Sequence, residues 1–282
     1  MKNIVLICTL FTASLGFSQV DYSELITSGE HNSYVKTAVR ERPVIAYPYL
    51  READVKFSRR VIRCIDVRQK MNKQLEWPRN PLNKFFYDKL SIGYENGGIR
   101  AYTNDSLQSI YTAEQFVMRG GTERPYFVQT NPDDPEEGYD SIIVIPYKWT
   151  DIKKYYVLED WIFDYKYSVF KPRILAIAPI FAPTVGGVAF GEQALCWMKM
   201  DEIRPMLVNL EMFNRYNDAA RLSYDDFFQM RIFDSYIVYE SNMYDNYLSR
   251  YQEFSEDTYA TLLKGEEIKN DLFIFEHDLW QY

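Results

Sequence analysis

Apolar and polar side chains alternate along the stretch 50–71, and this pattern predicts a strand. From Val55 to Val67 the apolar residues fall mainly on odd positions, while the charged residues Lys56, Arg60 and Asp66 occupy even ones. A period of two is typical of a β-strand with one buried face. Arg59 and Arg63 interrupt the apolar row. We therefore expect a long, largely antiparallel strand that carries two arginines on its apolar side.

A later stretch, 158–180, resembles the first and predicts an internal repeat. Aromatic and β-branched residues again take alternate positions there, and IYTAEQF (110–116) is answered by RLSYDDF (221–227). Self-similarity at a fixed spacing indicates a duplicated structural unit. The fold class that we predict is α+β, with two related β-rich halves, antiparallel or mixed sheets and short helices.

The N-terminal residues predict a leader that precedes the fold. Lys2 is followed by an apolar run, 4–15, that is too short to cross a bilayer, and Ser18 completes a small-residue cleavage site. We therefore interpret 1–18 as a secretory signal peptide. The next segment, 19–42, is polar without a steady period and is expected to be a flexible N-terminal arm.

A change of composition in the middle of the chain predicts the boundary between the two halves. Segment 126–140 is rich in proline and acidic residues, which favours a linker or a long surface loop. The first α+β half then spans 43–125. The second half spans 141–282 and is expected to end in helices.

Several short motifs predict where helices begin. Pro81 follows a potential cap, Asn80, and Thr112 precedes the helical stretch AEQF. Ser223 is followed three residues later by Asp226, close to a capping box. These signals place helices in both halves of the chain.

The C-terminal region carries further patterns. We expect the helix that Ser223 caps to continue to Tyr239, and the aromatic and leucine residues of 244–251 suggest another helical stripe. Ser255 is expected to cap a further short helix. The last stretch, 271–282, alternates, which predicts a strand or a segment that docks on a neighbour.

Composition excludes two classes of partner. The chain has 282 residues, a formal net charge of -8 and a sequence pI of about 5.0. No basic stripe stands out in the sequence, so we do not expect nucleic-acid binding or attraction to an anionic membrane surface. No apolar run of the sequence approaches the ~20 residues of a spanning helix, so no membrane-spanning segment is predicted for the mature chain.

The cysteines leave two alternatives. Cys64 and Cys196 remain after the predicted signal peptide, in a compartment that permits disulfides. Their spacing is wide and neither belongs to a paired motif. A bridge is possible, but the sequence favours two buried free thiols.

The sequence carries no catalytic or metal-binding motif such as HExxH, CxxC or a P-loop. Two carboxylate pairs are candidates for the acid and nucleophile of a glycosidase. Glu159 and Asp160 are adjacent on a predicted strand and should point to opposite faces, while Asp225 and Asp226 are simply explained as first-turn acids of a helix. We predict no catalytic residues, no metal site and no cofactor.

The remaining candidate chemistry is that of an interface with a partner. Our hypothesis for such an interface names six residues: Arg59, Arg63, Asp66, Glu240, Asn242 and Tyr244. Arginine is suited both to internal ion pairs and to partner contacts. We expect Arg63 to pair with Asp66 or with a carboxylate of a neighbouring strand, and Arg59 to contact a partner.

Three sequence blocks resemble one protein family. EADVKFSRRVIRCIDVRQKMN (52–72) is similar to the opening motif of the gliding motility protein GldN, called PorN in non-gliding relatives. LEDWIFD (158–164), followed by ILAIAPI, is similar to the central motif, and the segment 215–246 is similar to the C-terminal signature. With their spacing and the signal peptide, the blocks cover most of 50–246.

The resemblance implies a function without enzymatic activity. Proteins of this family are periplasmic components of the type IX secretion system of Bacteroidota, peripheral to the inner face of the outer membrane. They assemble in a ring with the lipoprotein GldK (PorK) and engage the periplasmic part of the motor protein GldM (PorM). The resemblance therefore implies self-association in a ring and these two partners.

The alternative hypothesis is a secreted or periplasmic glycan-binding or carbohydrate-active protein. In this alternative, Trp149, Trp161 and Trp197 would be stacking platforms for sugar rings. Clustering of the three in one exposed groove with opposed carboxylates would favour the alternative. Burial in a core would remove its main support.

Overall fold

The computed structural model describes residues 42–77, 80–131, 134–145, 147–182, 184–185, 188–189, 191–217, 219–254 and 257–279. The predicted signal peptide and nearly all of the predicted arm lie outside these residues.

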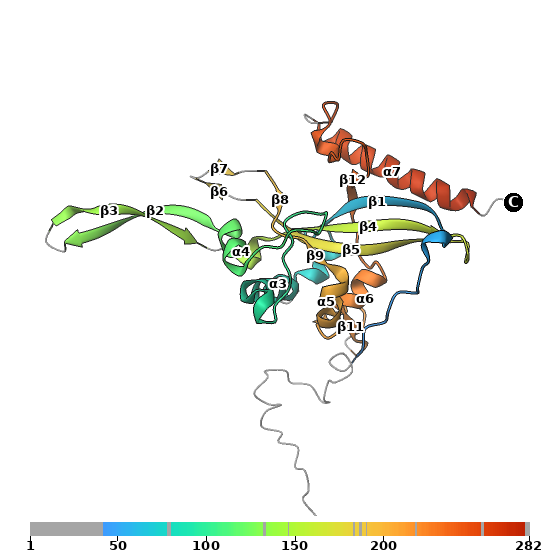
Figure 1. Cartoon of the computed structure of the whole chain (residues 1–282), viewed down its shortest axis with the longest axis horizontal. Helices are drawn as coiled ribbons and strands as arrows, with labels where there is room; N and C mark the ends of the chain where they lie inside the picture. The colour runs from blue at the N-terminus through green and yellow to red at the C-terminus, as the bar shows by residue number, and fades with distance from the viewer. Residues whose placement is uncertain are drawn as a thin grey trace, which may run out of the picture. The chain divides into compact units, whose positions relative to one another are not determined.

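The described residues form an α+β fold (Figure 1). The strands are β1 (Val55–Asp66), β2 (Thr122–Asn131), β3 (Asp134–Ile145), β4 (Lys154–Asp164), β5 (Val169–Phe181), β6 (Thr184–Val185), β7 (Val188–Ala189), β8 (Gln193–Ala194), β9 (Met198–Lys199), β10 (Glu211–Met212), β11 (Leu222–Ser223) and β12 (Tyr236–Glu240). The α-helices are α3 (Pro81–Ile92), α4 (Ala113–Gly120), α5 (Met200–Leu207), α6 (Tyr224–Gln229) and α7 (Thr258–Asp278). Short 3-10 helices are η1 (Glu52–Asp54), η2 (Asn72–Leu75), η3 (Tyr94–Asn96), η4 (Trp149–Asp151) and η5 (Leu248–Arg250).

The main sheet is antiparallel and curled, with the order β12-β1-β4-β5-β8, and β9 also pairs with β5. The predicted long strand is confirmed as β1, which pairs with β4 along its length. Odd positions are the less exposed ones from Val55 to Arg60, as the alternation predicts. From Val61 to Ile65 both faces are buried, because Ile62 packs in a second cluster with Trp197.

The structure does not show the predicted internal repeat. The stretch 50–71 contributes the single strand β1, whereas 158–180 supplies parts of both β4 and β5. These strands are neighbours in one sheet, and β1 lies between β4 and β12. The similar alternation therefore reflects the shared environment of strands in that sheet.

The predicted linker or loop 126–140 has strand structure over most of its length. It belongs to the hairpin of β2 and β3, which form a separate two-stranded sheet. Tyr126 pairs with Ser141, and Val128 pairs with Tyr139. The β-prone residues of 126–131 and 138–140 outweigh the prolines and acidic residues of the segment, so the described part is strand and not the irregular structure expected.

The predicted helix starts are confirmed at three places. Pro81 is the first residue of α3, although the side chain of Asn80 makes no capping hydrogen bond. Thr112 forms a capping box with Gln115 at α4, and Ser223 forms one with Asp226 at α6. Each box satisfies backbone N–H groups that have no partner in the first turn of a helix.

The helix after Ser223 is shorter than predicted. α6 ends at Gln229, and Arg231 has a φ of 55°, in the left-handed region that a helix does not continue through. Strand β12 begins at Tyr236, so the prediction of a helix to Tyr239 is wrong. Within 244–251, η5 is the only helical turn among the described residues.

The C-terminal stretch is helical as far as Asp278, which corrects the prediction of a strand in 271–282. Ser255 lies outside the described residues, and Asp257 is the residue that caps α7. Ile268 and Leu272 are buried at a spacing of four. The burial of this segment therefore follows the helical period and not the alternation of a strand.

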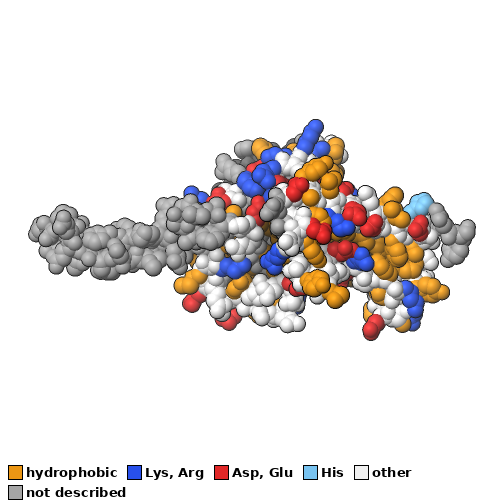
Figure 2. Space-filling model, turned by 90° about the horizontal axis from the view of Figure 1, so that it is seen from above, with side chains coloured by type: hydrophobic (Ala, Val, Ile, Leu, Met, Phe, Trp, Pro, Cys, Tyr) orange, Lys and Arg blue, Asp and Glu red, His pale blue; other side chains and the backbone are white. Residues whose placement is uncertain are grey.

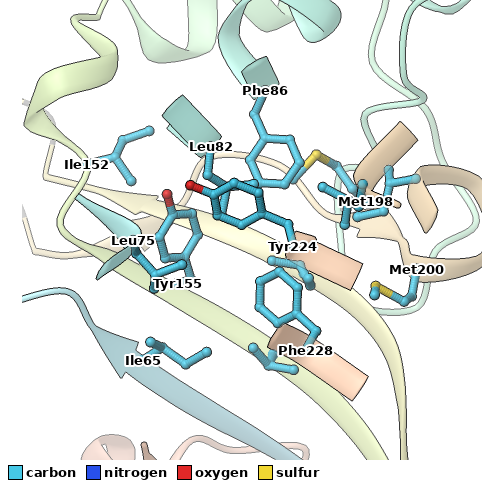
Figure 3. Packing of buried hydrophobic residues seen from close by; sticks show 14 of the residues in the cluster. Ile65, Leu75, Leu82, Phe86, Ile152, Tyr155, Met198, Met200, Tyr224 and Phe228 are labelled. Atoms are coloured by element: carbon cyan, nitrogen blue, oxygen red, sulfur yellow. The ribbon is translucent and has the colours of Figure 1, made fainter. Parts of the chain in front are cut away.

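The largest core lies between the sheet and helices α3, α5 and α6 (Figure 3). The rings of Tyr155, Tyr224 and Phe228 are fully buried there. Tyr155 donates its hydroxyl to Asn83, and burial holds the pKa of Tyr155 well above 10.0. This core fixes β4 against α3 and positions α6.

Both cysteines are buried and free, which confirms the favoured alternative. Burial raises the pKa of Cys64 to about 11 and raises that of Cys196 further. Because the thiolate is the nucleophile, both thiols are protected from oxidation in the folded protein.

Candidate interaction surface at the end of strand β12

Four of the six predicted interface residues lie together. Arg59 on β1 forms an ion pair with Glu240, the last residue of β12. Asn242 and Tyr244 follow in the loop after β12. The adjacent strands β1 and β12 bring residues that are far apart in sequence to one corner of the sheet.

The loop after β12 is held by Asn242. Its side-chain oxygen accepts hydrogen bonds from the backbone N–H groups of Tyr244 (3.0 Å) and Asn246 (3.1 Å). Its side-chain nitrogen donates to the carbonyl oxygens of Glu240 (2.8 Å) and Asn246 (2.9 Å). These four bonds satisfy the amide, so Asn242 shapes the loop. The loop presents Met243, which is 93% exposed, and Tyr244, which is 72% exposed.

A groove of about 600 Å³ adjoins this loop. Leu248, Tyr251 and Ile268 supply apolar parts of its lining, while Glu240 and Lys264 supply charged ones. The groove lies between the end of β12, η5 and α7. An apolar floor with a charged rim is the composition of many protein-binding surfaces.

Helix α7 closes one side of the groove and packs closely on β12. A Cβ atom at Gly265 would lie 2.5 Å from the carbonyl oxygen of Ile237, so only glycine permits this approach. Phe275 of α7 stacks on Phe57 of β1, with ring centroids 4.3 Å apart. These contacts anchor the helix on the sheet.

The outer side of α7 is partly apolar. Figure 2, which views the molecule from above, shows orange side chains gathered over part of this face. The exposed apolar residues of α7 are Tyr259, Leu262, Leu263, Phe273 and Ile274. We call Met243, Tyr244 and these five residues the β12–α7 surface. The short helix predicted after Ser255 covers Tyr259, Leu262 and Leu263, whereas Phe273 and Ile274 were missed as helical because 271–282 was expected to be a strand or a docking segment.

Arg63 does not belong to this surface. It is buried, and its guanidinium donates to the hydroxyl (2.8 Å) and the carbonyl oxygen (3.3 Å) of Ser235. The predicted pair with Asp66 is wrong, because residues three apart on a strand point to opposite faces. The carboxylate of neighbouring strand β4, Glu159, pairs with Arg231 at 2.7 Å. Burial lowers the pKa of Arg63, against the opposing effect of Glu159.

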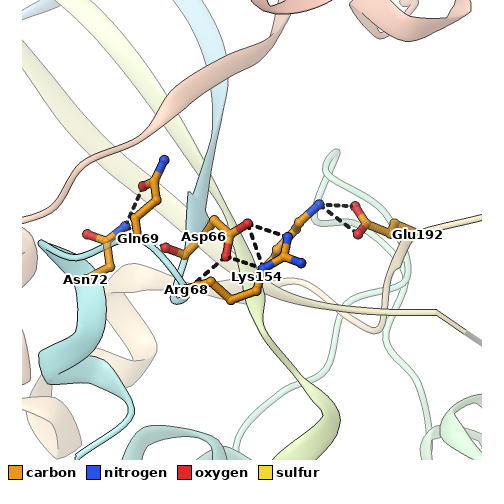
Figure 4. Close-up of polar contacts among 6 residues, drawn as sticks. All are labelled: Asp66, Arg68, Gln69, Asn72, Lys154 and Glu192. Atoms are coloured by element: carbon orange, nitrogen blue, oxygen red, sulfur yellow. Dashed lines mark hydrogen bonds and ion pairs between the residues drawn. The ribbon is translucent and has the colours of Figure 1, made fainter. Parts of the chain in front are cut away.

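Asp66 lies at the C-terminal end of β1 in a separate polar cluster (Figure 4). Arg68 donates to its carboxylate from the side chain (2.6 Å) and from the backbone (2.9 Å). The side-chain hydrogen bond holds the pKa of Asp66 below 3.8. Nearby, Lys154 pairs with Glu192 at 2.7 Å. The structure thus brings neither Arg63 nor Asp66 to the corner that Arg59 and Glu240 share.

A comparison with models of protein families finds a match over most of the chain. The family described as "Gliding motility associated protein GldN" matches residues 50–281.

The chain belongs to the GldN family. The match includes β1, β12 and α7, and hence the whole β12–α7 surface. Family membership implies a component of the gliding motility and type IX secretion machinery, and it suggests a location in the cell envelope. A comparison with curated proteins finds no match. No helix among the described residues is long and apolar enough to cross a membrane.

The carboxylate pairs of this GldN-family protein are neutralised by arginines. Glu159 is 0% exposed and bound by Arg231, whereas Asp160 points the other way and binds Arg60 at 2.7 Å. This confirms that the two adjacent acids of β4 lie on opposite faces. Arg231 is a partner that the sequence analysis did not identify.

The second pair is also divided. Asp225 forms a buried ion pair with Arg204 at 2.9 Å, while the carboxylate of Asp226 accepts hydrogen bonds from the hydroxyl and the backbone N–H of Ser223, the residue that caps α6. The expectation of two first-turn acids is therefore correct for Asp226 and incomplete for Asp225. In the part of the chain that the structure describes, no group of three or more His, Cys, Asp or Glu is placed to hold a metal ion.

The three tryptophans of the glycan alternative occupy different environments. Trp197 is buried with Tyr102 and Ile62, and Trp161 packs against the cluster under α7. Trp149 lies in η4 and is partly buried. Because Trp197 and Trp161 belong to separate clusters, the three do not form one exposed stacking groove, and the alternative loses its main support.

Proposed function

We propose that this GldN-family chain is a non-enzymatic structural subunit of the type IX secretion and gliding motility machinery. It acts in the periplasm, at the inner face of the outer membrane, where it assembles in a ring with the lipoprotein GldK (PorK) and contacts the periplasmic part of GldM (PorM). The predicted signal peptide 1–18 delivers it there, so the mature chain begins at Gln19.

The observation that carries the proposal is the β12–α7 surface. Met243 and Tyr244 are exposed on a loop that four hydrogen bonds of Asn242 hold in shape. Methionine and tyrosine are enriched in protein interfaces, and a tyrosine ring buries much area at low entropic cost. A surface of this kind is more suited to a partner than to solvent.

The charges beside this surface favour a specific partner. Glu240, although paired with Arg59, remains partly exposed, and Lys264 lines the same groove. A charged rim around an apolar centre selects one orientation of the partner and disfavours others. We propose that Arg59, Glu240 and Tyr244 contact the partner, while Asn242 positions the loop.

The arginines that pair with Glu159 and Asp225 favour a structural role over hydrolysis. A glycosidase needs one carboxyl with a raised pKa and a second one facing the substrate. Glu159 and Asp225 each have an arginine as ion-pair partner, so neither carboxylate is free to face a substrate.

The test is co-expression of the full chain with the lipoprotein, followed by purification through a tag on the lipoprotein and sedimentation. We expect the two proteins to sediment together as an assembly much larger than a one-to-one complex. Monodisperse monomers of this chain after co-expression and co-purification would overturn the proposal. N-terminal sequencing of the same material checks that the chain begins at Gln19.

A further inference from the structure

Residues 42–50, which we call the strap, cross helices α5 and α6 in extended form, without regular secondary structure. Side chains of the body hold the strap through its backbone oxygens. Arg204 donates to the carbonyl oxygen of Ile45 at 2.7 Å, and Arg173 donates to that of Pro48 at 2.8 Å. Such contacts recognise an extended backbone whatever chain it comes from.

Tyr47 is the central anchor of the strap. Its ring lies beside two guanidinium groups, 4.6 Å from Arg204 and 5.6 Å from Arg173, measured from the guanidinium carbon to the ring centroid. Its hydroxyl accepts a hydrogen bond from Gln229 at 2.8 Å. Arginine over an aromatic face is a favourable cation–π contact. At the end of the strap, Arg42 pairs with Asp226 at 2.5 Å.

The groove beneath the strap is built into the body. Arg204 is 4% exposed, and Asp225 holds its guanidinium by two hydrogen bonds of 2.9 and 3.2 Å. Arg204 belongs to α5 and Asp225 to α6, so the packing of two helices orients the group that binds the strap. A charged donor fixed by a second residue is a preorganised binding site.

The strap fills this groove incompletely. Within the described residues, no backbone–backbone hydrogen bond joins 42–50 to the rest of the chain. Ile45 is 68% exposed and Tyr49 is 86% exposed. Beside the strap, a cavity of about 490 Å³ extends to Arg173 and Asp201. The strap is therefore held by a few side-chain contacts, and two of its apolar side chains have no cover among the described residues.

We propose that the strap is exchanged between copies, so that residues 42–50 of one copy occupy the α5–α6 groove of the next. This inference rests on the self-association in the proposed function and names the joint through which it occurs. Exchange keeps every contact described above, because the groove of a neighbour has the same residues. The neighbour also supplies a surface that covers Ile45 and Tyr49.

The geometry of the strap suits such a joint. Nine extended residues span about 30 Å, which is the diameter of a small domain and enough to reach an adjacent copy. A strap that enters the next groove makes a head-to-tail contact, and contacts of this type generate a ring when the rotation between copies closes. The strap connects to β1 through the short turn of η1, where a change of backbone direction redirects the whole segment.

Cross-linking of full mature chains tests the exchange. One chain carries Ala46→Cys in the strap and the other carries Asp201→Cys in the groove, two positions that line the same cavity. The native thiols of Cys64 and Cys196 are buried and do not compete. The two chains are mixed at high concentration and treated with a short bifunctional maleimide. A mixture of Ala46→Cys and Lys269→Cys chains, whose second thiol lies on α7, is the control for random collision.

Exchange predicts a covalent dimer of the two different chains in the first mixture and at least tenfold less in the control. It also predicts a ladder of covalent oligomers when both cysteines are in one chain. A double-cysteine chain that cross-links only within itself, together with a first mixture that equals the control, would overturn the proposal.

A pair of substitutions at Tyr47 distinguishes docking of the strap from nonspecific proximity. Tyr47→Ala should reduce the mixed dimer several-fold, because both cation–π contacts and the hydrogen bond are lost. Tyr47→Phe keeps the aromatic ring and should retain most of the mixed dimer. Equal yields for wild type, Tyr47→Ala and Tyr47→Phe would contradict the assigned joint.

Failure of this inference and failure of the proposed function give different results. The chain could form a large assembly with the lipoprotein while the double-cysteine chain cross-links only within one molecule. That result would contradict the strap exchange and leave the proposed function standing. The purified chains could instead form the mixed covalent dimer but give no large assembly upon co-expression with the lipoprotein. That result would support the exchange and contradict the proposed ring.

Discussion

The same face of the main sheet is covered in two different ways. At one end, odd-numbered residues of β1 and β4 such as Ile65, Tyr155 and Val157 pack under α3, α5 and α6. At the other end, Val61 and Trp161 pack under α7. Between the two clusters lies a polar layer of Arg63, Ser235, Glu159 and Arg231.

The two ends differ in how much of the covering helix is buried. Helix α5 has 8 residues and buries four of them, whereas α7 has 21 residues and buries three. The first end thus commits its apolar residues to the core. The second end leaves apolar residues on the outside of α7, where a partner can cover them. The difference separates a part of the molecule built for stability from a part suited to contact.

The largest expected effect comes from matched phenylalanine truncations at the two ends. Phe228→Ala removes a fully buried ring of the main core and should lower the free energy of unfolding by about 3–5 kcal/mol. Phe275→Ala on α7 removes a partly buried ring and should cost less, because solvent already reaches the site. Denaturant unfolding of both variants measures the difference. A larger loss at Phe275 would invert the comparison.

The polar layer between the ends gives the next effect. Glu159→Gln leaves the partly buried Arg231 and the buried Arg63 without a carboxylate and should cost about 3 kcal/mol, in the range for breaking a buried pair. Asp160→Asn removes the exposed pair with Arg60 and should cost at most about 1 kcal/mol. Thermal and denaturant unfolding check both values. If the two variants lose equal stability, the layer is not the buried ionic element described above.

A smaller effect is expected where α7 meets β12. Gly265→Ala places a methyl group 2.5 Å from the carbonyl oxygen of Ile237, so α7 must shift, at a cost of about 1–3 kcal/mol. Gly191→Ala is the control, since a Cβ there meets nothing within 4 Å. Hydrogen exchange should show faster exchange in α7 and unchanged protection in α5. Loss of protection throughout the chain would mean that the two ends are not separable.

The smallest effect concerns pH and the polar end of β1. The pKa of Asp66 lies below 3.8 in the folded protein because Arg68 binds the carboxylate, so the folded state binds fewer protons than the unfolded state near that pH. The contribution of Asp66 is therefore present above pH 3.8 and is lost as the pH falls through its folded pKa. The difference in Tm between wild type and Asp66→Asn should shrink over that interval. A difference that is independent of pH would contradict this origin.

The sequence predicted the elements that depend on local chemistry. The alternation of β1 and the capping boxes at Thr112 and Ser223 rest on side chains that act on their own backbone neighbourhood. The buried free thiols followed from spacing and the absence of a paired motif. Such signals can be recognised in the sequence without knowledge of the tertiary contacts.

The features that the sequence did not predict depend on which elements meet. Arg63 was assigned to a carboxylate near it in sequence, whereas the fold brings it to Ser235 at the start of β12. Leu272 and its neighbours fit a strand by alternation until the burial of Ile268 and Leu272 shows a helical face. Arg59 and Glu240 were both named as interface residues, but their ion pair was not predicted because they meet only through the pairing of β1 with β12.

The central claim is that the β12–α7 surface joins this chain to its partners in the assembly. The measurement that tests it most directly is sedimentation of the complex co-purified with the lipoprotein, made with Met243→Glu or with Met118→Glu. Both methionines are strongly exposed, but Met118 lies on α4, away from this surface. We predict that Met243→Glu abolishes or greatly reduces the large assembly while the folded chain is retained, and that Met118→Glu leaves it intact. An unchanged assembly with Met243→Glu would contradict the claim.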